Sequence, residues 1–449
     1  MNSKIFYSLV FLLANTIICK AQIVSTGNIN FPQWIQQSNI YEVNVRQYSP
    51  EGTFKAFEKS LPRLKDMGVE ILWFMPITPI SKIDRKGALG SYYAVADYTT
   101  VNPEFGTMDD WKSLVKNAHA MGFKVITDWV ANHSGADNRW LQTNPDFYVR
   151  DKNGVAKYAF DWTDTRDLDY DNAELKDSMT HAMKFWVEET GIDGFRCDVA
   201  AEVPRSFWQP CIDALKKIKP DIFMLAEANT AWIHDAGFNT TYGWNMFAKM
   251  KEIASGKSSA RVLDTVLMHQ DETFVPGAIK LYFTSNHDEN SWNKSDYATF
   301  PGASHAPFAV LTQTMRASLP LIYSGQEEPY LDSLSFFYKD LITWGKYKRA
   351  PFYKTLLNER KNNPALAVDA GYTKILSTND DKIFAYTRQK NNNKILVVLN
   401  LSSSPVVISF KSSGISGEAI EIFTNQKENI TGNLAIPLQA WGYKVYRYL

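Results

Sequence analysis

An arginine and an aspartate stand two residues apart in the segment Gly191–Glu202, which reads GIDGFRCDVAAE. The apolar residues before this pair predict a buried strand that ends there. Residues two apart on a strand face the same side, so Arg196 and Asp198 should point into the same space. Burying such charges is costly unless they are paired or used in a function. A structural ion pair is the alternative interpretation.

Three further segments place acidic side chains directly after short apolar runs, and two of them add a histidine. They are DWVANH at 128–133, LAEA at 225–228 and TSNHDEN at 284–290. The acidic candidates of the four segments are Asp128, Asp198, Glu227 and Asp288. If these strand ends meet at one edge, the carboxylates cannot all ionise at their ordinary pKa values, and at least one pKa should be raised.

A carboxylate beside a protonated carboxylic acid is an arrangement that cleaves glycosidic bonds. We expect Asp198 to stay ionised because Arg196 neighbours it. Glu227 has no adjacent cation in the sequence, so it is the better candidate for the raised pKa and for the general acid/base. His133 and His287 can donate hydrogen bonds to sugar hydroxyls.

A metal site is the competing interpretation of acidic residues combined with histidines. The two histidines, His133 and His287, lack a tight ligand spacing. A guanidinium in the same space, that of Arg196, disfavours a metal cation. We therefore expect chemistry that requires no cofactor.

Strands alternate with helices about eight times before residue 362. The predicted strands are 40–48, 69–77, 123–131, 192–198, 221–227, 236–244, 278–286 and 319–324. The helices between them include Phe54–Met67 and Ala173–Thr190, each followed by a glycine. This alternation predicts a parallel sheet that closes into a (β/α)8 barrel. The site of such a barrel lies at the carboxyl ends of its strands, where the four acidic segments stand.

An irregular stretch at 133–171 follows the third strand and predicts a small inserted domain. Its large aromatic residues either pack the insertion or stack on sugars, and they include Trp140, Tyr148, Tyr158, Phe160 and Trp162. Short β-like runs with polar turns predict a C-terminal β-sandwich at 363–449. The barrel domain itself is expected at 22–362.

The chain has 48 basic and 48 acidic residues, so its formal net charge is zero, and nothing in the composition favours nucleic acid as a partner. Residues 1–21 have the pattern of a signal peptide, with cleavage before Gln22. We expect export to a periplasm or to the medium. Lipid attachment at Cys19 is less favoured, because no small residue precedes it. No second segment predicts a transmembrane span, and Cys197 and Cys211 are expected to be buried free thiols.

In order and spacing, the four acidic segments resemble the signature regions of glycoside hydrolase family 13, the α-amylase family. DWVANH resembles the first region, GFRCD the second, the glutamate of LAEA the third and SNHD the fourth. The segment at 90–107 resembles a further family segment near the second strand. The resemblance covers nearly all of the chain after the leader. It implies that the insertion is the family's domain B and the tail its domain C.

The resemblance implies a two-step retaining cleavage of α-glucosidic bonds, mainly α-1,4, in starch-like glucans or maltooligosaccharides. Asp198 then corresponds to the nucleophile, Glu227 to the general acid/base, and Asp288 to the carboxylate that binds and distorts the ring. Arg196 would hold the nucleophile, and Asp128 would support Arg196 and the ring. The other implied substrate-binding residues are Tyr93, His133 and His287.

The chain departs from the family pattern just after the proposed nucleophile. Many α-amylases carry Lys-His there, where this chain has Val199-Ala200-Ala201-Glu202. In the family that histidine helps to hold calcium, and the lysine helps to bind the leaving-group side. Asn132 is retained, so calcium binding stays open through this residue.

The motifs leave the exact activity open. An α-glucosidase, a cyclomaltodextrinase or neopullulanase-like enzyme, and a transglycosylase all share them, because hydrolysis and transfer differ only in the acceptor. A non-catalytic sugar-binding relative is a further alternative. Such proteins typically lose a catalytic carboxylate, and this chain retains all three.

Overall fold

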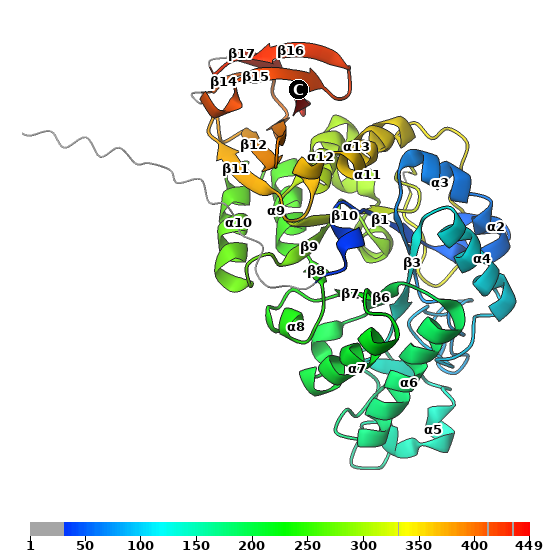
Figure 1. Ribbon diagram of the computed structural model, residues 1–449. Coiled ribbons are helices and arrows are strands. Elements are labelled where there is room, and N and C mark those ends of the chain that lie inside the picture. The colour runs from blue at the N-terminus through cyan, green and yellow to red at the C-terminus, as the bar shows by residue number, and fades with distance from the viewer. Residues whose placement is uncertain (1–30, 331, 411–412, 433–434) are drawn as a thin grey trace, which may run out of the picture.

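The computed structural model describes residues 31–330, 332–410, 413–432 and 435–449, and the predicted leader lies outside them. Eight parallel strands close into a barrel in the order β1-β10-β9-β8-β7-β6-β3-β2 (Figure 1). Their bounds are β1 Ile40–Val43, β2 Ile71–Phe74, β3 Lys124–Trp129, β6 Gly194–Cys197, β7 Phe223–Ala226, β8 Thr240–Tyr242, β9 Ile279–Tyr282 and β10 Ser318–Tyr323. The predicted (β/α)8 barrel is confirmed.

The barrel strands are buried on both faces, as parallel sheets covered by helices are. Side chains of one core cluster fill the barrel, among them Ile40, Ile71, Ile126, Phe223 and Ile279. Burial on both faces explains why the strands are apolar runs rather than alternating ones.

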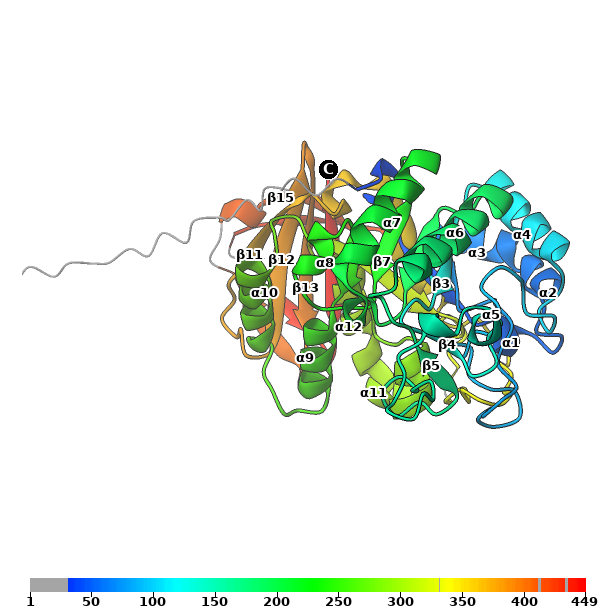
Figure 2. The same cartoon turned by 90° about the horizontal axis from the view of Figure 1, so that it is seen from below.

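Helices follow the strands around the barrel (Figures 1 and 2). Their bounds are α2 Phe54–Glu58, α3 Leu61–Met67, α4 Met108–Ala120, α6 Ala173–Thr190, α7 Arg205–Ile218, α8 Trp232–Asp235, α9 Trp244–Ala254, α10 Val262–Thr273, α11 Asp296–Thr299, α12 His305–Thr314 and α13 Ala350–Asn362. Helix α6 has the predicted bounds, because Asn172 caps its first turn and Gly191 ends it at φ 74°.

Two predictions about the first barrel unit were wrong. The predicted helix 54–67 is two helices, and the second begins at Leu61 with Pro62 in its first turn. The predicted strand 40–48 ends at Val43, and Val45–Tyr48 form the helical turn α1. The Arg46 guanidinium at this turn donates to the carbonyls of Leu89, Gly90 and Phe336, which ties together loops around the barrel mouth.

The insertion after β3 contains β4 His133–Gly135, α5 Trp140–Thr143, the 3-10 turn η2 Pro145–Phe147 and β5 Thr165–Asp167. Strands β4 and β5 pair antiparallel. Trp140 stacks on Tyr98 with ring centroids 4.8 Å apart, and Tyr148 is buried against Ser134, so both aromatic residues pack the insertion. Tyr158 and Phe160 are exposed instead.

The described residues after α13 form sheets and short 3-10 turns. A six-stranded antiparallel sheet has the order β11-β12-β13-β18-β15-β16, and β14 pairs with β17. The bounds are β11 Gly371–Ile375, β12 Ile383–Lys390, β13 Asn393–Asn400, β14 Val406–Ser409, β15 Gly417–Glu421, β16 Gln426–Ile430, β17 Ala435–Leu438 and β18 Tyr443–Tyr448. One face of the large sheet packs on the two-stranded sheet, and the other packs near α12 (Figure 2). The predicted C-terminal all-β domain is confirmed.

Cys197 and Cys211 are free and buried, as predicted. A search of the described residues for a helix long and apolar enough to cross a membrane found none.

Candidate active site

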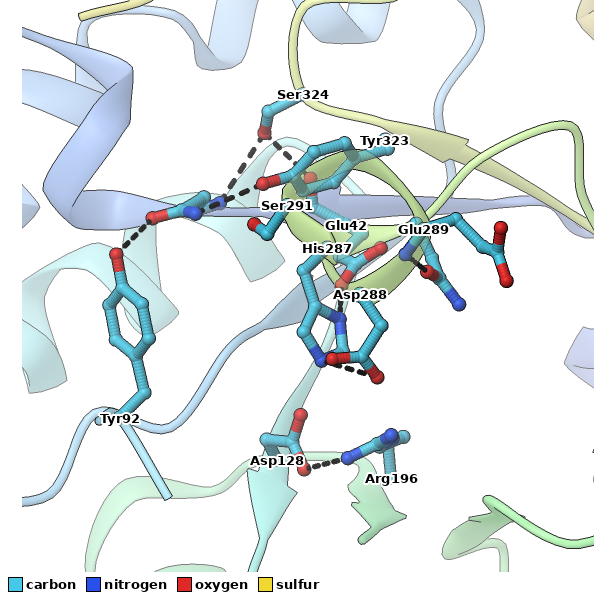
Figure 3. Close-up of polar contacts among 12 residues, drawn as sticks. Glu42, Tyr92, Asp128, Arg196, His287, Asp288, Glu289, Ser291, Tyr323 and Ser324 are labelled. Carbon is cyan, nitrogen blue, oxygen red and sulfur yellow. Dashed lines mark hydrogen bonds and ion pairs between the residues drawn. The ribbon is translucent and has the colours of Figure 1, made fainter. Parts of the chain in front are cut away.

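Arg196 lies fully buried at the end of β6 and joins three carboxylates. Its Nη1 lies 2.8 Å from Asp128 Oδ1 and 2.9 Å from Asp198 Oδ1. Its Nη2 lies 2.9 Å from Glu227 Oε2. The Nε donates to the Tyr242 hydroxyl at 3.0 Å. Figure 3 shows Asp128 facing this guanidinium below His287. The guanidinium thus balances part of the negative charge gathered at the barrel mouth.

The register of the barrel strands brings Arg196 and these carboxylates together. Asp128 on β3 is the direct cross-strand partner of Arg196 on β6. Beyond the last ladder pairs, the Asp198 N–H donates to the Trp129 carbonyl and the Glu227 N–H donates to the Cys197 carbonyl. The acidic residues therefore lie at the same level of the barrel, where their strands end.

Val199, directly after Asp198, adopts a left-handed backbone with φ 33° and ψ 46°. A β-branched residue rarely occupies this region, and such strain clusters at functional sites. In this conformation the Val199 N–H donates to Glu227 Oε2 at 2.8 Å. The backbone after Asp198 thus holds the Glu227 carboxylate.

The two central carboxyls differ in pKa in the direction opposite to the sequence-based expectation. Burial alone would raise the pKa of Glu227, but the Arg196 guanidinium, the Val199 N–H and a hydrogen bond with Asp198 lower it. Burial raises the pKa of Asp198 well above its usual range, and the charge of Glu227 adds to this effect. The expectation failed because Arg196 reaches Glu227 from the neighbouring strand β6, although no cation adjoins Glu227 in sequence.

His287 lies between two carboxylates, as Figure 3 shows. Its Nδ1 is 2.5 Å from Glu42 Oε1, and its Nε2 is 3.4 Å from Asp288 Oδ2 and 2.6 Å from the Tyr93 hydroxyl. Burial alone would lower the pKa of His287, but Asp288 and Glu42 outweigh it and raise the pKa to about 9. The ring is therefore a cation at neutral pH.

Glu42 was not among the residues predicted from the sequence. It lies on β1, is fully buried, and its second oxygen, Oε2, has no hydrogen-bond partner among the described residues. The available signal was an acidic residue inside the apolar strand at 40–43. A buried carboxylate in a barrel strand needs a partner, and the partner is His287.

His133 is buried and neutral, since burial lowers its pKa to about 3. The Asn132 side-chain amide lies 3.3 Å from Nδ1 and donates to it, which leaves Nε2 as the protonated ring nitrogen. Nε2 has no hydrogen-bond partner within the described ranges. The ring also lies edge-on to Trp162 at 5.2 Å. His133 can therefore donate a hydrogen bond to a ligand.

A cavity of about 400 Å³ collects most of the predicted site residues. It is lined by Tyr93, His133, Asp198, Glu227, His287 and Asp288. Asp128, Arg196 and Asn132 do not line it; Asp128 and Arg196 hold lining residues through the contacts above. Aromatic rings complete the wall, with Tyr93 stacked on Phe336 at 5.9 Å and Trp292 5.0 Å from Phe336. Polar groups between aromatic walls fit a sugar ring.

Calcium binding through Asn132 stays a prediction. The Asn132 side-chain amide is engaged with His133, and its carbonyl accepts from the Leu168 N–H. Nowhere in the part of the chain that the structure describes do three His, Cys, Asp or Glu side chains come close enough to hold a metal ion.

Comparison with known families accounts for almost the whole described chain. The family model described as the α-amylase catalytic domain matches residues 29–164 and 157–365. The model of the maltogenic amylase C-terminal domain matches residues 373–445. The two matches correspond to the barrel with its insertion and to the C-terminal sheets.

Individual relatives are also similar to this chain over most of its length. The crystal structure of a noncanonic maltogenic α-amylase, AmyB from Thermotoga neapolitana, superposes with a TM-score of 0.85 at 28% identity, covering 92% of this chain and 99% of that one. The α-amylase MalA of Haloarcula japonica is 26% identical to this chain. The matched region covers 88% of this chain and 59% of MalA. A cyclomaltodextrinase of Thermoanaerobacter pseudethanolicus is 23% identical over 84% of this chain and 72% of its own.

Proposed function

Because the chain belongs to the α-amylase family and is a glycoside hydrolase of that type, we propose that it cleaves mainly α-1,4-glucosidic bonds in starch-like glucans or maltooligosaccharides with retention of configuration. The observation that carries this proposal is the joint contact of Arg196 with Asp198 and Glu227 in a sugar-sized cavity. Two carboxyl groups side by side supply both the nucleophile and the proton donor of a retaining glycosidase.

In the first step, Asp198 attacks the anomeric carbon while Glu227 protonates the glycosidic oxygen, which breaks the bond to the leaving sugar. This step requires a protonated Glu227 and an ionised Asp198. Entry of the glycosidic oxygen beside Glu227 supplies an acceptor for that proton, and Arg196 stabilises the Asp198 carboxylate that results. In the second step Glu227 takes a proton from water, the water oxygen attacks the anomeric carbon, and Asp198 is released.

The other lining residues bind the sugar at the cleavage point. Asp288 and the His287 cation present an acceptor and a donor to ring hydroxyls, and neutral His133 adds a second donor. The Tyr93 ring supplies an apolar face. Asp128 orients Arg196 and Tyr93 through its two oxygens.

A narrower activity on short or cyclic oligosaccharides is the second candidate. The cavity favours it, because Trp162, Trp292, Phe336 and Phe337 enclose the space around the carboxylates. Relatives described as a maltogenic amylase and a cyclomaltodextrinase add support. An α-glucosidase or a transglycosylase would use the same groups.

Product analysis on soluble starch, maltoheptaose, pullulan and β-cyclodextrin separates these activities. Mixed maltooligosaccharides from starch support the α-amylase, whereas glucose or maltose alone, or cleavage confined to the cyclic substrate or pullulan, supports the oligosaccharide enzyme. Asp198→Asn and Glu227→Gln should each lose on the order of 10⁴-fold in kcat. Asp221→Asn, an exposed residue before β7, should retain full activity. Wild-type turnover that survives Asp198→Asn would contradict the proposed nucleophile.

We also propose that the enzyme is exported, on the basis of the leader-like sequence at 1–21. Expression with its own leader should yield a mature protein that begins at Gln22 in the periplasm or the medium. A lipid-modified Cys19 recovered from membranes would instead establish anchoring.

A further inference from the structure

A second hollow, of about 820 Å³, lies on domain B, the insertion at 133–171, together with the loop that contains Asp84. Tyr158 and Phe160 line it, and their side chains are 50% and 56% exposed. We propose that these two rings extend the catalytic cavity into a binding track for the remote part of an α-glucan chain. This inference rests on the proposed function and adds a second binding region to it.

Trp162 connects the hollow to the catalytic cavity. Trp162 lines the cavity itself, and its ring lies 4.7 Å from that of Phe160, which lines the hollow. Its other neighbour is His133, one of the cavity donors. The aromatic surface is therefore continuous from the cavity to Phe160, and a chain bound at the carboxylates can extend along it.

The backbone holds Phe160 outward. Phe160 has a left-handed backbone with φ 52°, a conformation that is unfavourable for a bulky residue. The turn around it is fixed, because the Trp162 N–H donates to the Ala159 carbonyl and Thr165 Oγ1 accepts from the Ala159 N–H. Apart from its contact with Trp162, the Phe160 ring is left exposed, and a strained residue of this kind is more typical of a functional site than of a core.

The polar groups of the hollow favour a neutral, hydroxyl-rich ligand. Arg166 is paired with Asp84 at 2.7 Å, and both acidic and basic side chains line the hollow. The mixture of acidic and basic side chains offers both acceptors and donors, which suits the hydroxyl groups of a glucan. Aromatic faces beside such groups are the usual surface for sugar stacking.

The test measures binding apart from hydrolysis. In the Asp198→Asn background, Tyr158→Ala/Phe160→Ala should weaken binding of amylose, in affinity electrophoresis, about tenfold or more. In the active enzyme the same pair should lower kcat/KM for amylose by a similar factor and leave maltotriose unchanged. Val407→Ala is the matched control, because Val407 is an apolar residue that is 68% exposed and lines neither the cavity nor the hollow. Unchanged melting temperatures would exclude misfolding.

If the double variant lowers kcat/KM equally for amylose and maltotriose, or for neither, the proposed binding track is wrong. Sedimentation provides a third readout: if the wild type dimerises and the double variant does not, the hollow is a contact between copies of the chain, and the proposal is wrong. If the wild type neither binds nor cleaves any α-glucan, the proposed function has failed as well. If it cleaves starch and the double variant behaves like the wild type, only the track has failed.

Discussion

At the scale of single residues, Glu42 acts on the substrate only through His287. Glu42→Gln removes the charge that opposes burial at His287, so the pKa of His287 should fall from about 9. If the His287 cation donates to a sugar hydroxyl, the alkaline limb of kcat/KM should move to lower pH by about one unit or more. A pH–rate profile on maltoheptaose measures this. An unshifted limb would show that Glu42 has only a structural role.

The Glu42–His287 pair also makes the free energy of unfolding depend on pH. The pKa of His287 is about 9 in the native protein and about 6.5 in an unfolded chain, so its contribution to stability is complete below about pH 6.5 and disappears as pH rises through 9. In Glu42→Gln, the free energy of unfolding should decrease less between pH 6.5 and 9 than in the wild type. Denaturant titrations across this pH range measure the difference. Glu327→Gln is the matched control, because Glu327 is equally buried and instead contacts Tyr41 and Arg63.

The acidic residues of the site were predictable because each follows a hydrophobic strand, and strand ends meet in a barrel. The contacts that shift the pKa values of these residues were not predictable. Arg196 reaches Glu227 from another strand, and Val199 turns its N–H inward through a left-handed backbone. Both contacts join β6 and the residues after it to Glu227 after β7, and neither can be recognised from the neighbours of Glu227 in sequence. The raised pKa was therefore predicted for Glu227 instead of Asp198.

At the scale of elements, strand β9 carries a buried lysine. Lys280 Nζ donates to Thr241 Oγ1 at 2.8 Å and lies 3.1 Å from the centre of the Phe274 ring. Burial lowers the pKa of Lys280 to about 6, whereas the unfolded chain binds this proton up to about pH 10.4. The unfolded state thus holds more protons between these values, and stability should rise with pH there.

Lys280→Met removes this dependence. Its advantage in unfolding free energy over the wild type should be largest near pH 6 and shrink toward pH 10, by up to about 1.4 kcal/mol per pH unit. Guanidinium titrations at four pH values measure it, with the exposed Lys257→Met as control. Parallel curves for Lys280→Met and the wild type would contradict the buried neutral amine.

Element bounds were predictable where a local stop signal exists, and less so elsewhere. Gly191 ends α6 at the predicted residue. The first strand was predicted too long, because 44–48 continues the alternating pattern of 40–43. In the fold Arg46 and Gln47 turn to donate to loop carbonyls from distant segments. Such tertiary contacts leave no mark in local periodicity.

At the scale of the whole molecule, Arg388 joins the C-terminal sheet to the barrel. This fully buried guanidinium donates to the carbonyls of Thr314 and Met315 at the end of α12 and to those of Ala367 and Ala370. Arg388→Met leaves these carbonyls unpaired and should destabilise the protein by about 3–5 kcal/mol. Calorimetry should show a lower melting temperature, with the sheets unfolding ahead of the barrel.

Arg447→Met provides the comparison. Arg447 lies on β18 of the same sheet, but its side chain is 44% exposed and makes one ion pair with Glu359. Its loss should cost less than about 1 kcal/mol. Equal effects of the two substitutions would mean that Arg388 does not tie the sheet to the barrel.

The architecture could be predicted because strands and helices alternate along the barrel and only β-like runs follow it. The β-like runs that the sequence shows after residue 363 lie at 383–388, 395–401, 406–410, 419–423 and 441–448, so it indicates no strand at β11, β16 or β17. Strand β16 is polar, with three of its five residues exposed, and β17 contains Pro437, which cannot donate a ladder hydrogen bond. Composition gives the class of such a domain more readily than its strand count.

The two buried thiols make the enzyme a convenient object for site-specific chemistry. Cys197 and Cys211 are shielded from solvent, and burial raises the pKa of both, so neither forms the reactive thiolate. A cysteine introduced at the domain B rim, as in Val155→Cys, would then be the one thiol open to a fluorescent maleimide among residues 31–330, 332–410, 413–432 and 435–449. The dye would report the arrival of a long glucan in real time, with both stacking rings of the hollow intact.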